Sequence, residues 1–153
     1  MEAALAIPFG FPLSLVITLC LEAPLTPPEA LVKKAIAFYK ANGRAQMIQE
    51  VNGPGGCLHE GGLYVFVYDM FGTVVAHGQK PELIGRNFYN IPDPAGNYFA
   101  RERIRIVHEK GKGWQDYVYL NPETKKWEYK TAYVEGVEDL IFGCGTYKAK
   151  KTK

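Results

Sequence analysis

The sequence predicts a single α+β domain in which a mainly antiparallel sheet is flanked by helices. Its 153 residues are one domain's worth of chain. Apolar residues make up 47% of the chain and aromatic residues 13%, which is enough to form a buried core. The predicted elements follow in the order helix, helix, two strands, long loop, helix, three strands. One helix therefore lies between strands 2 and 3.

Two helices open the domain. Thr26, Pro27 and Glu29 form a helix start signal, with a threonine cap, a proline in the first turn and a glutamate that completes a capping box. Apolar residues then recur on one face over residues 29–41. A second, shorter helix is predicted over residues 45–51.

The middle of the chain predicts two strands and a long loop. Aromatic and β-branched residues mark strands over residues 63–68 and 73–77. Residues 78–97 are rich in glycine and proline, and a loop this long in a small domain is usually functional. Asn97 is expected to cap a helix over residues 98–110.

The last third of the chain predicts three strands in an antiparallel meander, over residues 114–120, 127–134 and 140–147. Asn121 and Pro122 mark the first turn between them, and Glu135 and Gly136 mark the second.

The charge balance argues against nucleic-acid binding. The net charge is +2, from 18 basic and 16 acidic residues, whereas a nucleic-acid-binding domain concentrates basic residues on one face. The basic cluster at the C-terminus, residues 149–153 with the adjacent Lys148, is interpreted as a solvated tail.

The N-terminal segment predicts export. Residues 3–21 are apolar and uncharged, and this length fits a signal peptide or a membrane anchor. A buried core helix is the alternative, but the segment lacks the polar side of such a helix. We therefore divide the chain into a signal peptide or anchor (1–25), one domain (26–148) and a basic tail (149–153), and expect a periplasmic or secreted location.

The cysteines allow two interpretations. Cys20 lies in the apolar N-terminal segment, which leaves Cys57 and Cys144 either as a disulfide pair or as two buried thiols. Their spacing does not suggest zinc.

The sequence gives no catalytic motif. Asp69, His77 and Cys144 lack the spacing and local context of a known nucleophile site. His59, with Glu60 beside it, and His108 do not form a metal-ligand pattern. We expect no catalytic residue, no metal and no cofactor.

An ordered set of short motifs resembles the single Cache domain family over roughly residues 29–148. The motifs are Tyr64-Val65-Phe66-Val67-Tyr68-Asp69, Gly72, Ala76-His77, Gly85-Arg86-Asn87, Asp93-Pro94-Ala95-Gly96, Gly111-Lys112-Gly113-Trp114, Lys130-Thr131-Ala132-Tyr133-Val134 and Gly143-Cys144-Gly145-Thr146-Tyr147. The chain departs from the family pattern at Gly78, Tyr119 and Tyr129, where proline, tryptophan and proline are common.

The resemblance implies a PAS-like central antiparallel sheet behind a long N-terminal helix. It also implies extracytoplasmic sensing of small organic acids, with signalling through a partner protein or a homodimer. The expected ligand is therefore a small organic anion, most simply a short carboxylate.

Strand geometry and the resemblance select the core of a ligand site. Lys130 would supply charge for an anion, and the hydroxyls of Tyr117 and Tyr119, which share a face, would complete its hydrogen bonds. His77, at a strand end, would donate to the ligand. The alternative interpretations, which give these residues no role in ligand binding, are a solvated Lys130, tyrosines that only pack in the core, and a partly exposed histidine that caps its strand.

Three further residues complete the predicted ligand site. Asp93 and the loop around it would close over the ligand, and Arg86 is a second candidate for charge, with Arg101 behind it. Tyr133 is also included, although by parity it cannot share a face with Lys130 in a regular strand.

Two other functions remain open, an interaction module without a ligand and a small secreted enzyme. A sensor should have a buried, polar-lined cavity with Lys130 or His77 reaching into it. An enzyme should have an acid–base pair within a cleft, and an interaction module should have neither.

Overall fold

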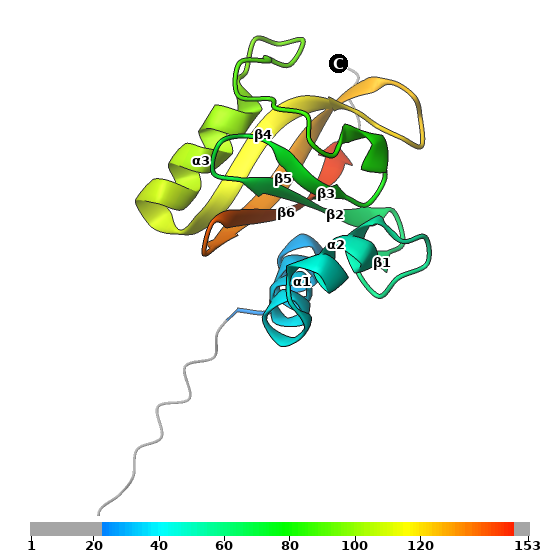
Figure 1. The fold of residues 1–153 in the computed structure, drawn as a ribbon. Coiled ribbons are helices and arrows are strands. Elements are labelled where there is room, and N and C mark those ends of the chain that lie inside the picture. The colour runs from blue at the N-terminus through cyan, green and yellow to red at the C-terminus, as the bar shows by residue number, and fades with distance from the viewer. Residues whose placement is uncertain (1–22, 149–153) are drawn as a thin grey trace, which may run out of the picture.

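The sheet lies in the middle of the domain with helices on both faces (Figure 1). The computed structural model describes residues 23–148. It confirms the predicted α+β fold and its order of helices and strands. The elements are α1 (Pro27–Asn42), α2 (Arg44–Asn52), β1 (His59–Glu60), β2 (Leu63–Asp69), β3 (Val74–His77), the 3-10 turn η1 (Pro81–Leu83), α3 (Phe99–Lys110), β4 (Lys112–Leu120), β5 (Trp127–Val137) and β6 (Leu140–Lys148).

The sheet is antiparallel throughout its pairs, with the strand order β1-β2-β6-β5-β4 and with β3 paired to β2. The predicted meander of the last three strands is confirmed. The two-residue β1 was not predicted, because two residues carry no periodic pattern. Helix α3 connects β3 to β4, the second and third of the predicted strands.

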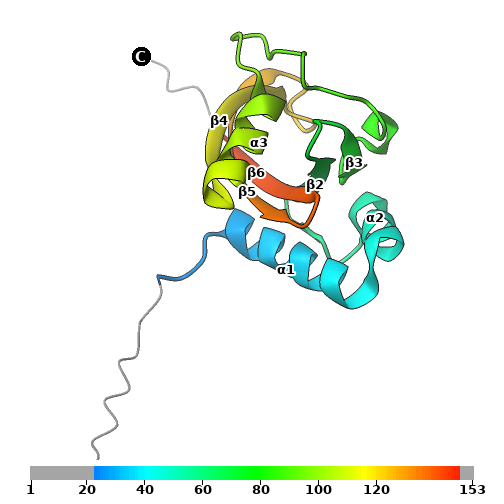
Figure 2. The ribbon, with the colours of Figure 1, turned by 60° about the vertical axis from the view of Figure 1, so that its left-hand side comes forward.

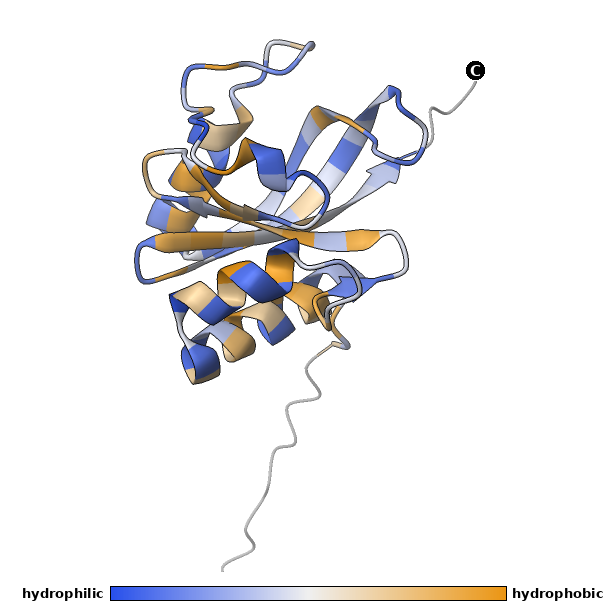
Figure 3. Ribbon diagram, turned by 45° about the vertical axis from the view of Figure 1, so that its right-hand side comes forward, coloured by the Kyte–Doolittle hydropathy of each residue, from blue (hydrophilic) through white to orange (hydrophobic). Residues whose placement is uncertain are grey.

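Helices α1 and α2 cover one face of the sheet (Figure 2). The capping box is present, since the Glu29 carboxylate accepts hydrogen bonds from the backbone N–H and the hydroxyl of Thr26 at 2.8 and 2.9 Å. The two helices meet at Gly43, whose φ of 84° favours glycine. Figure 3 shows the helices as mixtures of hydrophobic and hydrophilic residues, consistent with one buried side.

Helix α3 and the loop before it cover the other face. The helix begins at Phe99, and no side chain caps it. The prediction that Asn97 caps this helix is therefore wrong. Its side-chain Nδ2 instead donates to Asp93 at 3.0 Å.

Cys57 and Cys144 are free thiols, so the predicted alternative of a disulfide between them is wrong. The other alternative holds for Cys144, which is buried, and fails for Cys57, which is exposed.

The predictions for the N-terminal segment and the basic tail fall largely outside the described residues. Over residues 23–148, no helix combines the length and the apolar character needed to span a membrane.

Candidate functional site

The face of the sheet under α3 carries a cluster of buried polar and aromatic side chains. Alternate strand residues point to the same face, so Tyr117 and Tyr119 of β4 lie here together. Lys130 of β5 is the direct cross-strand neighbour of Tyr117. His77 ends β3 opposite Phe66 and stacks against it on this face. Four of the predicted site residues are therefore brought together.

Lys130 lies at the centre of this cluster, with 1% of its surface exposed. Its Nζ donates a hydrogen bond to the hydroxyl of Tyr64 at 2.9 Å. Nζ also lies 4.4 Å from the ring centroid of Tyr64, 5.1 Å from those of Phe66 and Tyr147, and 5.3 Å from that of Tyr119. Aromatic faces attract a cation, but no ion pair among residues 23–148 joins Lys130 to a carboxylate.

The surroundings of Lys130 disfavour its charged form. Burial, together with the nearby positive charges of Arg103 and Lys80, lowers the pKa of the Lys130 ammonium to about 7. The interpretation of Lys130 as a solvated strand lysine is therefore wrong. An anion placed beside Nζ would compensate the buried charge and restore the ammonium form.

Tyrosine hydroxyls extend the hydrogen bonding away from Lys130. The hydroxyl of Tyr64 is 2.8 Å from that of Tyr147 on β6. Burial raises the pKa of Tyr147 to about 12 and also raises that of Tyr64. Both hydroxyls therefore keep their protons at neutral pH. One proton is used in the bond between them, which leaves one hydroxyl able to donate to an anion.

His77 is a neutral hydrogen-bond donor, and it also caps its strand. Its Nδ1 accepts hydrogen bonds from the backbone N–H groups of Gln79 at 3.2 Å and Lys80 at 3.0 Å. In the neutral ring the proton then sits on Nε2. Burial, followed by the charge of Lys130, lowers the pKa of His77 to about 3. The ring is 2% exposed and stacks on Tyr119, so the expected partial exposure is not found.

Arg103 of α3 is a second buried cation on this face, and sequence reasoning missed it. Its side chain is 1% exposed, and its Nε donates to Oε1 of Gln115 at 3.0 Å. Its guanidinium carbon lies over four aromatic rings, those of Tyr68 (4.4 Å), Phe66 (4.6 Å), Phe99 (5.1 Å) and Tyr117 (5.4 Å). Like Lys130, it forms no ion pair within the described part of the chain.

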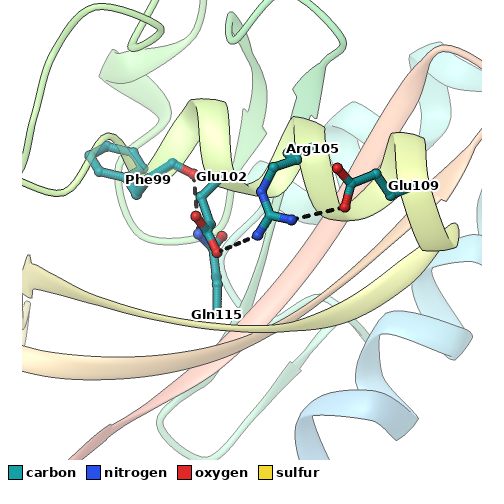
Figure 4. A network of polar contacts seen from close by, with 5 residues as sticks. All are labelled: Phe99, Glu102, Arg105, Glu109 and Gln115. Atoms are coloured by element: carbon teal, nitrogen blue, oxygen red, sulfur yellow. Dashed lines mark hydrogen bonds and ion pairs between the residues drawn. The ribbon is translucent and has the colours of Figure 1, made fainter.

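Gln115 fixes α3 against the sheet. Its Nε2 donates to the backbone carbonyl of Phe99 at 3.1 Å (Figure 4). Because its Oε1 also accepts from Arg103, one amide links Arg103, the start of α3 and β4. Figure 4 also shows Arg105 between Glu102 and Glu109, at 3.1 and 2.9 Å. These three are exposed, so this network belongs to the solvent side of the helix.

Asp93 holds the long loop to the edge of the sheet. Its carboxylate accepts hydrogen bonds from the backbone N–H groups of Ala95 (3.0 Å), Asn97 (2.7 Å) and Val118 (2.7 Å), and from Nδ2 of Asn97 (3.0 Å). Burial alone would raise the pKa of Asp93, but these bonds lower it on balance. Asp93 has therefore a structural role in this structure and is not a free group closing over a ligand.

Replacing Asp93 with alanine should destabilise the domain by about 2–4 kcal/mol, because four donors to a charged acceptor lose their partner. Urea unfolding measures this free energy. Glu82→Ala, in the same loop and exposed, is the control and should change stability by less than about 0.5 kcal/mol. Equal losses of unfolding free energy for the two substitutions would show that the hydrogen bonds of Asp93 do not stabilise the domain.

Tyr133 lies on the opposite face of the sheet, as its parity requires. It packs in the core under α1, next to Trp114, and its hydroxyl donates to Glu135 at 2.7 Å. The assignment of Tyr133 to the pocket is therefore not supported by its position.

The two arginine candidates lie at the surface. Arg101 donates from Nε to the backbone carbonyl of Tyr89 at 2.8 Å and from Nη2 to Asn90 at 2.6 Å, which braces the long loop. Arg86 is exposed, and its guanidinium lies 4.9 Å from the ring centroid of Phe88.

A hollow of about 200 Å³ lies beside the buried cluster. The long loop and the end of β4 line it, with Lys80, Arg86 and Phe88 on the loop side and Phe99 and Tyr119 on the side of the cluster. The expected cavity with Lys130 or His77 reaching into it is not open, because aromatic rings enclose both residues. Tyr119 connects the hollow with the buried cluster, since it lines the hollow and contacts Lys130.

A larger groove of about 400 Å³ runs along the β4–β5 turn. Tyr147 lines it, together with Glu123 and Glu128, but neither buried cation does. We therefore place the candidate site at the buried cluster and the smaller hollow.

The site residues that sequence reasoning missed had a signal in their spacing. Phe99, Arg103 and Ile106 recur at helical spacing on the buried side of α3, which puts an arginine into an apolar stripe. Tyr64 alternates with Phe66 on β2 and therefore shares its face.

The arrangement suits binding of an anion. Two buried cations, neutral donors and aromatic walls converge on one face. Within residues 23–148, no three His, Cys, Asp or Glu side chains come together to hold a metal ion.

Comparison with known proteins identifies the family. The family model "Single Cache domain 2" matches residues 40–149. Among solved structures, the chain is similar to the periplasmic sensor domain of a chemotaxis protein, with 23% identity, a TM-score of 0.65, and coverage of 78% of this chain and 87% of that one. A methyl-accepting chemotaxis protein from Vibrio parahaemolyticus gives 21% identity, a TM-score of 0.69, and coverage of 78% and 85%.

A Cache chemosensory domain, whose structure is described as the structural basis for carboxylic acid recognition, is also similar. It gives 23% identity, a TM-score of 0.64, and coverage of 78% of this chain and 85% of that one. These likenesses agree with the α+β, PAS-like fold. The family match spans well over half of the sequence, and the chain therefore belongs to the single Cache domain 2 family.

Proposed function

We propose that this domain is an extracytoplasmic sensor that binds a small organic anion, a short carboxylate, at Lys130. The observation that carries the proposal is a buried lysine with no carboxylate partner in the described part of the chain. A buried charge is costly unless an opposite charge or hydrogen bonds compensate it. A ligand carboxylate would supply both.

The neighbouring groups provide the remaining hydrogen bonds. The ammonium of Lys130 has three donors, and Tyr64 accepts one of them. The hydroxyl of Tyr64 and the Nε2–H of His77 face the same cluster and can donate to the second carboxylate oxygen. Tyr117 and Tyr119 form the aromatic wall that fits a short apolar chain.

The family and the similar proteins support sensing as the role. One similar structure is the periplasmic sensor domain of a chemotaxis protein and another is a methyl-accepting chemotaxis protein. A third, a Cache chemosensory domain, is described as recognising carboxylic acids. The proposal assigns residues 1–25 to export or anchoring, residues 26–148 to the sensor domain and residues 149–153 to the basic tail. Signalling would pass to a partner protein or through a homodimer, and no catalytic residue is assigned.

A thermal-shift series tests the proposal with matched probes. Propionate carries the carboxylate, propionamide has the same shape without charge, and propylamine has the opposite charge. Propionate at a hundredfold excess over its dissociation constant should add about 2.7 kcal/mol of stability. The other two should have little effect, because neither supplies a negative charge to Lys130. Equal stabilisation by propionamide, or no stabilisation by propionate, acetate, pyruvate or butyrate, would contradict the proposal.

A further inference from the structure

We infer that the anion sensed by this domain carries two acidic groups, and that Lys80 and Arg86 at the hollow bind the second. The inference rests on the proposed function at Lys130 and names the class of ligand, a short dicarboxylate. Its basis is the number and position of the cations around Tyr119.

The site holds more positive charge than one carboxylate can compensate. Lys130 and Arg103 are both buried, and both lie against the ring of Phe66, at 5.1 and 4.6 Å from its centroid. Lys80 is half-buried next to them, and Arg86 lies at the surface of the same hollow. Within residues 23–148 none of these four cations forms an ion pair.

The buried Lys130 and the outer cation Lys80, which lines the hollow with Arg86, are close enough to be contacted by one small molecule. The Nζ atoms of Lys80 and Lys130 each lie 5.3 Å from the ring centroid of Tyr119, so at most one tyrosine ring separates them. Lys80 is held there because its backbone N–H donates to Nδ1 of His77. A short dicarboxylate could therefore place one carboxylate on each ammonium.

The acidic residue that lines the hollow forms no ion pair with Lys80 or Arg86. Asp93 accepts hydrogen bonds from four donors on its own loop and on Val118, and none of them is Lys80 or Arg86. The rest of the hollow is mostly aromatic and aliphatic, including Phe88 and Phe99. Two cations over an apolar wall suit an acidic group at the end of a short hydrocarbon spacer.

The test compares two four-carbon acids that differ in one carboxylate. Calorimetry at pH 6.5 measures the affinities of succinate and butyrate for the full chain and for the double variant Lys80→Gln/Arg86→Gln. We expect wild type to bind succinate at least tenfold more tightly than butyrate. The double variant should lose at least ten times more affinity for succinate than for butyrate. Lys110→Gln, an exposed lysine at the end of α3, controls for general loss of charge.

The outcomes separate this inference from the proposed function. If butyrate binds as well as succinate, or the double variant weakens both acids equally, the second anionic site is wrong while the Lys130 site stands. If neither acid binds wild type, or both bind Lys130→Met as tightly as wild type, the Lys130 site itself is wrong and this inference falls with it.

Discussion

Replacing Lys130 with methionine is expected to weaken propionate binding at least a hundredfold, which is about 2.7 kcal/mol. The substitution removes the charge at the centre of the site but keeps a long, flexible, apolar side chain. The four rings around Nζ retain a packing partner, so no cavity forms. Calorimetry on both proteins at pH 6.5, where Lys130 is mostly protonated, measures the loss.

The matched control is Lys126→Met, which removes an exposed lysine from the β4–β5 turn. It lowers the net charge by the same amount and should leave propionate binding within about twofold of wild type, because distant surface charges are screened. Similar affinities for wild type and Lys130→Met, with the fold intact by circular dichroism, would mean that the anion binds elsewhere.

The stability of the unliganded domain should rise with pH between about 7 and 9. The pKa of Lys130 is lowered to about 7 in the folded protein, so the unfolded chain binds more protons in this range. The free energy of unfolding then increases by up to about 1.4 kcal/mol per pH unit. Urea unfolding at several pH values measures the slope, and Lys130→Met should remove it.

Other titratable groups determine how stability changes with pH below and above the range of pH 7 to 9. Burial lowers the pKa of His77 to about 3, so stability also falls as the pH drops below about 6.5, because the unfolded histidine takes up a proton there. Burial raises the pKa of Cys144 to about 11, so above about pH 9 the unfolded thiol ionises first, and its loss of stability offsets the gain from Lys130 and flattens the rise. A flat profile between pH 7 and 9 in wild type, or the same slope in Lys130→Met, would show that Lys130 is not buried as a neutral amine.

The order of elements could be predicted because each one has a local cause. The capping box at Thr26 and Glu29 marks the start of α1, and a run of aromatic and β-branched residues marks β2. The error at Asn97 has a local cause too. An asparagine before a helix is a good cap, but here its amide is engaged by Asp93, which no pattern of helix propensity contains.

The site was only partly predictable because it depends on which elements share a face. Parity along one strand placed Tyr117 with Tyr119 and separated Lys130 from Tyr133. The partners of Lys130 on other strands, such as Tyr64, could not be predicted. Their identification depends on the register between β2, β6 and β5, which is not evident from the sequence.

The contact between Gly143 and Phe66 also depends on how the strands pair. Gly143 of β6 lies directly under the ring of Phe66, where a side chain would collide with it. This glycine leaves room for the Phe66 ring, which lies against both buried cations, and such a fit emerges only from the assembled sheet.

The number of protons taken up when propionate binds at pH 8 shows whether the carboxylate lies on Lys130. Calorimetric titrations in phosphate and in Tris, whose ionisation enthalpies differ, give this number from the difference in the observed heats. With a pKa of about 7, Lys130 is mostly neutral at pH 8 before binding and becomes an ammonium beside the bound carboxylate. We expect an uptake of nearly one proton per propionate bound to wild type. Binding with no proton uptake would contradict it, because the carboxylate would then not lie on the buried amine of Lys130.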